Sequence, residues 1–185
     1  MTNNPIVFTF QKDGLYFEKY DISFSTIKKN KILKKNEILL VDLNTIPPTI
    51  ITKQYEVIFL THDSKNDLEL FAKTYNLKTN DKIDIWEIIC RFFLDSEWPV
   101  SHDEFTKAKE LGFDQGEIDI IRTKVENTFF MNSEWSHLSQ LDLLLRKQTS
   151  ILYKLTGRKF YWWTMEIATR GLRTTTGNSK QAQAG

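Results

Sequence analysis

The sequence predicts an α+β protein: an N-terminal antiparallel β-sheet closed by a helix, followed by an all-helical C-terminal region. Three observations lead to this class. Between residues 6 and 61, apolar residues alternate with polar ones or form short runs, as they do in strands. From residue 64 onward, apolar residues recur every three or four positions, which is the spacing of one helical face. Strands that come first and helices that come afterwards are typical of an α+β arrangement.

The N-terminal strands begin with a hairpin. Two apolar runs, residues 6–10 and 15–20, flank a short segment that contains Asp13 and Gly14. An Asp-Gly pair favours the backbone angles of a tight hairpin turn. The two runs are therefore expected to pair as antiparallel neighbours.

Further strands are expected before residue 62. Residues 21–27 alternate polar and apolar with a period of two, as in a half-buried strand. A basic loop over residues 28–35 follows, and then two strands at residues 37–43 and 54–61, with Pro-rich breakers between them. A short strand at residues 50–52 is an open alternative.

A helix is expected from Ser64 to about Asn76. Ser64 suits the N-cap position, and Asp67 three residues later completes the capping pattern. Its apolar face comprises Leu68, Phe71, Ala72 and Tyr75. In the order and size of its elements, this part resembles pleckstrin-homology and GRAM-like domains, and the resemblance implies a small rolled sheet closed by the helix.

Beyond residue 79 the pattern predicts about five helices. The expected segments are residues 80–94, 101–111, 114–129, 133–145 and 159–170. Ser101 and Asp114 each precede an acidic residue by three positions, which is a capping signal, and Gly112 suits the end of a helix. The predicted organisation is a β-rich domain with its covering helix at residues 1–77, a helical domain at 78–173 and a disordered polar tail at 174–185.

Composition excludes several classes of protein. With 41% hydrophobic and 26% charged residues among 185, the chain is an ordinary globular protein. The net charge of +1 gives no global attraction to nucleic acid or anionic lipid, although the segments 1–77, 78–147 and 148–185 carry +1, −5 and +5. One cysteine, no secretory signal and no long apolar stretch predict a cytoplasmic protein that is not inserted in a membrane.

Catalytic signals are sparse, so a non-enzymatic protein without a cofactor is favoured. The chain has no nucleophile elbow and no glycine-rich phosphate loop, and Cys90 lies in an apolar run that predicts a buried, inert thiol. A metal-dependent enzyme is one alternative. Glu134 and His137 are one helical turn apart, as in di-iron bundles, and His102 lies near further carboxylates. A second copy of that motif is missing, so helix capping explains these residues equally well.

Nucleic-acid binding is the other alternative. A short basic stretch contains Lys28, Lys29, Lys31, Lys34 and Lys35. The segment 158–173 mixes basic residues with Phe160, Tyr161, Trp162 and Trp163. Such mixtures bind the backbone and stack on the bases of single strands, although adjacent tryptophans in a helix are more often core residues.

The leading interpretation is a protein-interaction or assembly protein whose partner is another protein or a second copy of itself. Trp98 and Trp135 lie at expected helix boundaries, where large rings often contact partners. The basic C-terminal segment is the second candidate contact surface. The predicted contact residues are Trp98, Trp135, Arg158, Lys159, Arg170 and Arg173.

Overall fold

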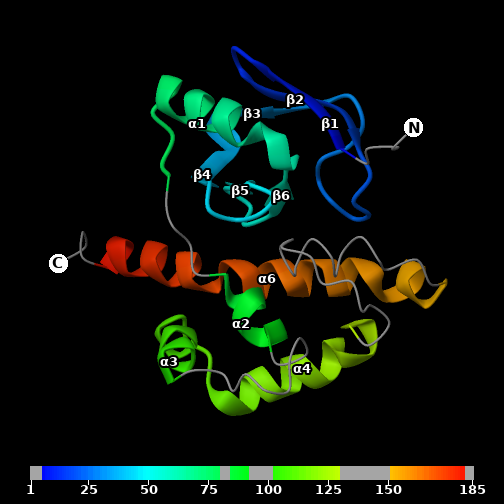
Figure 1. Ribbon diagram of the computed structural model, residues 1–185, viewed down its shortest axis with the longest axis vertical. Coiled ribbons are helices and arrows are strands. Elements are labelled where there is room, and N and C mark those ends of the chain that lie inside the picture. Colours follow the sequence, from blue (N-terminus) through cyan, green and yellow to red (C-terminus); the bar gives the residue numbers. More distant parts are fainter. Residues whose placement is uncertain (1–5, 80–83, 92–101, 130–150, 182–185) are drawn as a thin grey trace. The chain divides into compact units, whose positions relative to one another are not determined.

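The computed structural model describes residues 6–79, 84–91, 102–129 and 151–181 (Figure 1). The chain forms two compact units, each built from two separate stretches. Residues 1–82 and 148–165 form the sheet unit, and residues 83–147 and 166–185 form the helical unit. Helix α6, Ile151–Gln181, contributes residues to both units.

The sheet unit contains two antiparallel sheets of three strands each, which confirms the α+β class. The first sheet has the order β1-β2-β3, with strands Ile6–Gln11, Gly14–Tyr20 and Lys31–Lys34. The second has the order β4-β5-β6, with strands Ile38–Asp42, Thr49–Thr52 and Val57–Phe59. Two 3-10 helices, η1 (Lys35–Glu37) and η2 (His62–Ser64), follow β3 and β6, and α1 spans Lys65–Thr74.

The predicted N-terminal hairpin is confirmed. Gln11 pairs with Gly14 across a turn made of Lys12 and Asp13. The structure adds a second reason for the glycine, because a Cβ at Gly14 would overlap the carbonyl oxygen of Leu33 in strand β3. The residue that closes the turn must therefore also let a third strand approach closely.

Two expectations for the following residues are wrong. Residues 21–27 are not a strand: Phe24 has a φ of 67°, and the Ser25 amide donates to the Ile22 carbonyl within a turn. The alternation instead reflects a loop that is anchored by the buried side chains of Ile22 and Ile27. Residues 28–35 are not entirely a loop, because β3 occupies Lys31–Lys34 and pairs with β2. Leu33 is the buried residue of β3, and the lysines on both sides of it made the segment look like a polar loop in the sequence.

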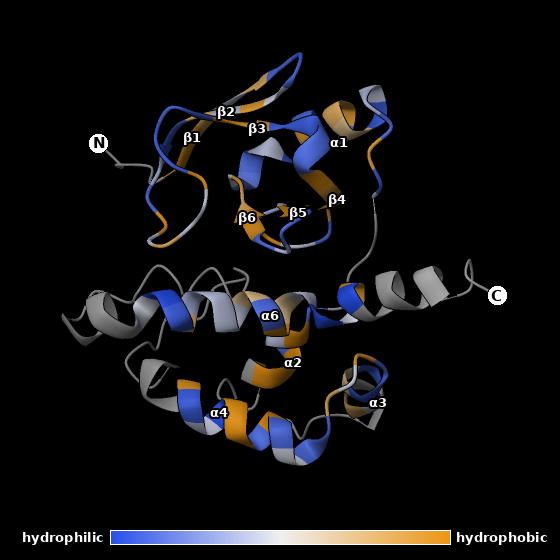
Figure 2. Cartoon of the chain, turned by 180° about the vertical axis from the view of Figure 1, so that it is seen from behind, coloured by the Kyte–Doolittle hydropathy of each residue, from blue (hydrophilic) through white to orange (hydrophobic). Residues whose placement is uncertain are grey.

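Both sheets contribute to an aromatic and aliphatic core. All residues of β5 and β6 are buried, and Figure 2 shows these strands in hydrophobic colours. Helix α1 buries Leu68, Phe71 and Ala72, as its spacing predicted. Ser64 stands at the N-cap position but does not cap the helix, because its hydroxyl donates backwards to the Thr61 carbonyl at 2.6 Å.

The described part of the helical unit and of α6 contains fewer helices than the five expected. Helices α2 (Ile85–Arg91), α3 (His102–Glu110), α4 (Gln115–Phe129) and α6 are present, and only the last three exceed two turns. The Asp114 carboxylate accepts from the Glu117 amide at 2.8 Å, which confirms the predicted cap of α4. Gly112, with a φ of 83°, ends α3 as expected.

Helix α6 is longer than predicted at both ends. It starts at Ile151 rather than 159 and continues to Gln181, through most of the tail that was expected to be disordered. Threonines and a glycine lower the intrinsic helix propensity of this tail, but a helix that is already nucleated gains one backbone hydrogen bond for each added residue. No helix within the described ranges combines the length and the apolar character that crossing a bilayer requires.

Candidate functional site

A groove runs between strand β1 and helix α1 in the sheet unit. It consists of two adjoining cavities of about 450 and 430 Å³. The first is lined by Ile6, Val7, Phe8, Thr9, Phe10, Thr61, Asp63, Ser64 and Asp67. The second is lined by Phe10, Gln11, Lys12, Asp67, Leu70, Phe71, Thr74 and Tyr75. Because Phe10 and Asp67 line both cavities, we treat them as one feature, the β1–α1 groove.

The groove lies along the edge of the first sheet. Among the described strands, β1 pairs with β2 alone and therefore lies at the edge of its sheet. Successive side chains of a strand point to opposite faces, yet the first cavity touches five consecutive residues, Ile6 to Phe10. A cavity that contacts consecutive residues must follow the edge of the strand, where the backbone amides and carbonyls lie.

Strand β1 is regular along this edge. The bulge in the hairpin falls between the pairs Val7–Lys19 and Phe8–Phe17, so the extra residue is Glu18 in β2. A bulge in an edge strand would interrupt its row of backbone groups and protect it from pairing. Here the interruption lies in the neighbouring strand, and β1 keeps an uninterrupted row.

One end of the groove is acidic. Asp63 and Asp67 line it and are exposed, and neither forms an ion pair among the described residues. A hydrogen bond from the Thr61 side chain lowers the pKa of the Asp63 carboxyl below its usual value, and the backbone amide of Asp63 and the charge of His62 act in the same direction. The Asp63 carboxylate is therefore charged at neutral pH.

The other end of the groove is apolar and rigid. Leu70 is 66% exposed, although it is a large aliphatic residue. Beside it, the ring of Phe71 contacts Phe10 and Tyr75 at centroid distances of 5.3 and 4.9 Å. The Lys35 ammonium lies 4.3 Å from the centroid of the Tyr75 ring. An exposed leucine on a fixed aromatic floor is a typical contact point for a partner.

A second polar feature, the Glu56 cluster, lies inside the sheet unit and comprises Glu56, Ser25, Thr26 and Tyr161. Glu56 is completely buried. Its Oε1 accepts from the Ser25 hydroxyl at 2.7 Å, the Thr26 amide at 2.9 Å and the Tyr161 hydroxyl at 2.5 Å. Its Oε2 accepts from the Thr26 hydroxyl. Both carboxylate oxygens are thus used within the chain.

Tyr161 links helix α6 to this cluster. Burial raises the pKa of its phenol well above the usual value, and electrostatic interactions with Glu56 and Tyr20 and the hydrogen bond to Glu56 add to this effect. The phenol therefore stays protonated and donates a hydrogen bond to Glu56. Nearby, the Val57 amide donates to the Met165 sulfur at 3.2 Å. The cluster is saturated by its own chain, which is the arrangement of a structural network.

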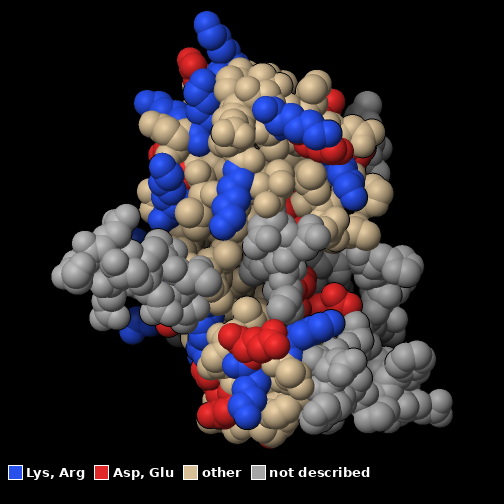
Figure 3. Space-filling model, turned by 90° about the vertical axis from the view of Figure 1, so that its left-hand side faces the viewer, with Lys and Arg blue, Asp and Glu red and all other residues tan. Residues whose placement is uncertain are grey.

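The lysines that were predicted for nucleic acid lie before β3, on β3 and, for Lys35, at the start of η1. Lys28, Lys29 and Lys34 are exposed. Lys31 donates to the Thr26 carbonyl at 3.1 Å, and Lys35 is held by the Tyr75 ring. On the face shown in Figure 3, basic side chains of the sheet unit are separated by uncharged surface. Nucleic-acid binding by this stretch stays a prediction.

The predicted basic contact residues of α6 differ in their surroundings. Arg158, Lys159 and Arg173 are exposed. Arg170 is instead committed within the helical unit: it makes two hydrogen bonds of 2.7 Å to the Glu117 carboxylate, and its guanidinium carbon lies 3.9 Å from the Phe113 ring centroid. Trp162 and Trp163 are half-buried, so neither is a free stacking platform.

The residues of the metal alternative lie mostly outside the described part of the chain. This applies to Glu134 and His137, to the predicted contact residues Trp98 and Trp135, and to the side chains of His102 and Cys90. Within the described residues, no group of three or more His, Cys, Asp or Glu side chains is placed to hold a metal ion. Metal binding by Glu134 and His137 stays a prediction.

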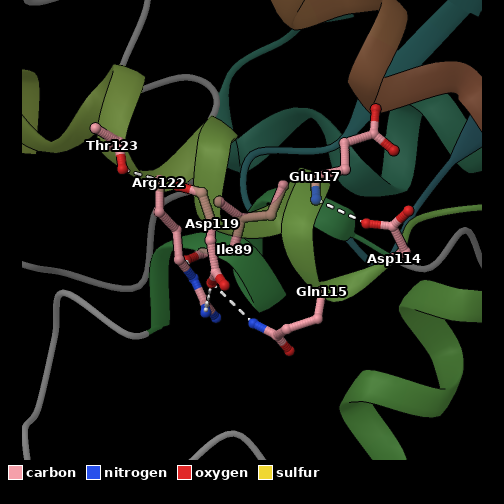
Figure 4. A network of polar contacts seen from close by, with 7 residues as sticks. All are labelled: Ile89, Asp114, Gln115, Glu117, Asp119, Arg122 and Thr123. Atoms are coloured by element: carbon pink, nitrogen blue, oxygen red, sulfur yellow. Dashed lines mark hydrogen bonds and ion pairs between the residues drawn. The ribbon is translucent and has the colours of Figure 1, made fainter.

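Polar contacts in the helical unit join its helices (Figure 4). The Asp119 carboxylate accepts from Gln115 at 2.8 Å and lies 3.5 Å from the Arg122 guanidinium. Arg122 also donates from Nε to the Ile89 carbonyl at 3.1 Å, and thereby ties α4 to α2. A carbonyl near the end of a helix lacks an intrahelical partner, so this contact is explained by helix packing.

Sequence reasoning missed both the β1–α1 groove and the Glu56 cluster. One signal for the groove was available: Leu70 falls between the positions of the apolar stripe that contains Leu68 and Phe71. A large apolar residue outside the stripe of an amphipathic helix is a candidate contact residue. The Glu56 cluster had no comparable signal, because its partners are 30 and 105 residues away in the sequence.

Comparison with protein-family models, curated proteins and solved structures finds no match to this chain. The functional argument therefore rests on the geometry of the site. The β1–α1 groove brings together a strand at the edge of its described sheet, two exposed carboxylates and an exposed leucine, and it is the candidate functional site of this protein.

Proposed function

We propose that this chain is a non-enzymatic protein-interaction protein that binds its partner in the β1–α1 groove. The observation that carries the proposal is the position of Leu70, which is 66% exposed, in the groove beside β1, a strand at the edge of its described sheet. Each feature alone exposes the chain to unwanted association. A partner that covers both the edge strand and Leu70 would explain why the two features occur in one groove.

The polar groups of the groove support binding rather than catalysis. Catalysis by a serine requires a hydroxyl that is activated by a neighbouring base. The hydroxyl of Ser64 donates to the Thr61 carbonyl. The Thr61 side chain forms a hydrogen bond with Asp63, whose depressed pKa makes it a weak base at neutral pH.

The resemblance to pleckstrin-homology and GRAM-like domains belongs to this proposal. Two small antiparallel sheets followed by a helix agree with it at the level of element order. Such small scaffolds can carry unrelated functions, so the resemblance adds little to the argument about the site.

The proposal is tested by placing a photo-crosslinking amino acid at position 70 of the full chain in the source cells. Position 120 provides a matched control, because Ile120 is 69% exposed and lies on α4 of the helical unit. We expect a discrete crosslinked product from position 70 that is absent from position 120. Identical products at both positions, or none at position 70, would overturn the proposed function.

A further inference from the structure

We infer that the partner of the β1–α1 groove is an amphipathic helix that packs along α1 in the antiparallel direction. Its acidic N-terminal part faces Lys12, its apolar stripe covers Leu70, and its basic C-terminal part faces Asp63 and Asp67. This inference rests on the proposed function and gives the partner a chemical class and an orientation.

Helix α1 lines the groove with a continuous stripe of its surface. The stripe consists of Asp67, Leu70, Phe71, Thr74 and Tyr75, the last of which ends the helix. Spacings of three and four positions place these residues on one face. At a rise of about 1.5 Å per residue, the stripe is roughly 12 Å long, or about two helical turns. Such a stripe suits a second helix, whose side chains fit between those of the first.

A helical partner binds through its side chains and makes no demand on the backbone of β1. A helix satisfies most of its own amides and carbonyls internally. Both walls of the groove offer apolar side chains to it. Leu70 on α1 is 66% exposed, and the ring of Phe10 on β1 contacts Phe71 at a centroid distance of 5.3 Å. The apolar stripe of the partner removes Leu70 from water, and this burial favours binding.

Charges of opposite sign mark the two ends of the groove. The first cavity joins the start of β1 to Asp63 and Asp67, and the second joins the end of β1 to the C-terminal end of α1. Lys12 lines the second cavity and is exposed. The Lys35 ammonium, 4.3 Å from the centroid of the Tyr75 ring, adds a positive charge at this end. A complementary partner is therefore basic at the first end and acidic at the second.

This charge pattern sets the direction of the partner helix. Acidic side chains stabilise the N-terminal end of a helix and basic side chains its C-terminal end, because of the helix dipole. A helix with its N-terminal end at Lys12 and its C-terminal end at Asp63 satisfies its own dipole and the groove together. Since α1 runs from Asp67 toward Tyr75, the partner runs antiparallel to it.

The experiment uses the purified full chain and a display library of helical peptides of about 16 residues. Leucines are fixed at spacings of three and four on an alanine-rich background, and both flanks are randomised among Glu, Lys and Gln. Peptides that also bind Leu70→Gln, a variant that keeps the net charge, are removed. Ile120→Gln is the matched control and should bind every selected peptide as the wild type does. We expect Glu before the leucines and Lys after them, and the opposite order would overturn the antiparallel orientation.

The helical conformation is then tested with proline in the best selected peptide. Proline in the middle of a helix breaks it, whereas proline at the first helical position is tolerated. We expect central proline, placed away from the leucines, to weaken binding at least about tenfold and first-position proline to leave it unchanged. Equal binding by the two peptides would show that the partner is not a helix.

The charge assignment is tested by reversal. The wild type should bind the selected peptide about fivefold more tightly than a variant whose C-terminal lysines are replaced by Glu, and Asp67→Lys should prefer that variant. Glu69→Lys is the matched control, because it makes the same change at a partly exposed position of α1 outside the groove. It should keep the wild-type preference. The same preference in Asp67→Lys and Glu69→Lys would refute the assigned basic end.

Failure to select any peptide that depends on Leu70 would overturn the inference as a whole. If position 70 still crosslinks to a partner in cells, the proposed function survives that failure, and a partner of another shape takes the place of the helix. If position 70 gives no crosslinked product either, the inference and the proposed function fail together.

Discussion

The sheet unit contains acidic side chains in two contrasting settings. Glu56 is completely buried, and both its oxygens accept hydrogen bonds from the chain itself. Asp63 and Asp67 are exposed on the wall of the β1–α1 groove and make no ion pair among the described residues. The number of internal partners thus separates an acid that stabilises the fold from acids that are available to another molecule.

Mutations of the two kinds of acid should therefore have different effects, one on stability and the other on binding. Loss of a buried acceptor leaves its donors without partners, and the fold bears the full cost of their desolvation. Loss of an exposed group costs the fold little, and the effect appears in binding. The predictions below test this separation, from the largest expected change in the free energy of unfolding to the smallest.

Glu56→Ala should lower the free energy of unfolding by about 3 kcal/mol or more, because the buried hydroxyls of Ser25 and Tyr161 and the partly buried donors of Thr26 all lose their acceptor. Urea denaturation measures the change. Glu69→Ala is the matched control: Glu69 is partly exposed, forms an ion pair with Lys73 on the same helix and should have no measurable effect. A stable Glu56→Ala protein would contradict the structural role of the cluster.

Tyr161→Phe should cost about 1–2 kcal/mol, because one of the donors to Glu56 is lost. Tyr16→Phe is the control, since its hydrogen bond to Asn30 is exposed and should contribute little. Because the pKa of Tyr161 is raised in the folded protein, its stabilising effect is complete below the pKa of an unfolded tyrosine, about 10, and is lost as the pH rises further.

The alkaline range therefore gives a separate measurement. Above about pH 10, the unfolded chain releases a proton that the folded chain retains at Tyr161. The free energy of unfolding of the wild type should fall more steeply than that of Tyr161→Phe, by about 1.4 kcal/mol per pH unit. Parallel slopes in urea titrations at increasing pH would show that the phenol is not held in its neutral form.

Arg170→Gln represents an intermediate case. The Arg170 and Glu117 side chains are 26% and 36% exposed, so solvent weakens their two short hydrogen bonds, and stacking on Phe113 adds to the contact. We expect a loss of about 1 kcal/mol that becomes smaller in high salt. A loss that does not depend on salt would indicate that packing on Phe113 is the main contribution.

Leu70→Gln should change the free energy of unfolding least, by no more than about 0.5 kcal/mol, because Leu70 is mostly exposed and glutamine forms helices well. Its effect should instead appear as weaker binding of the partner in the groove. Thermal denaturation of this variant beside Ile120→Gln gives the comparison. A large fall in melting temperature for Leu70→Gln alone would place Leu70 in the fold rather than at a contact surface.

Local signals were sufficient for some elements of this fold. The hairpin followed from Asp13-Gly14, and the start of α4 followed from Asp114, because both depend on residues within a few positions of each other. The alternation over residues 21–27 misled because a loop anchored by Ile22 and Ile27 buries residues at irregular intervals. The capping pattern of Ser64 also misled, because the Thr61 carbonyl takes its hydroxyl.

The candidate site was less predictable, because it depends on partners that are distant in the sequence. The groove exists only when β1 and α1 are brought together, and their residues are more than fifty positions apart. Glu56 looks like an ordinary polar residue before a strand until Tyr161 lies beside it. The bond between Arg170 and Glu117 was not predictable for the same reason, since Glu117 is 53 positions away.

The division of α6 between the two units has a consequence for folding during synthesis on the ribosome. The Glu56 carboxylate and the Tyr161 hydroxyl that completes its cluster are 105 residues apart. At roughly 5–20 residues per second, a ribosome needs on the order of 5–20 s to synthesise the residues between them. Throughout that time the nascent sheet unit has its strands, but it lacks the segment of α6 whose Tyr161 hydroxyl donates to Glu56. The sheet unit therefore completes its folding only after Tyr161 has been synthesised, even though its strands are made well before that residue.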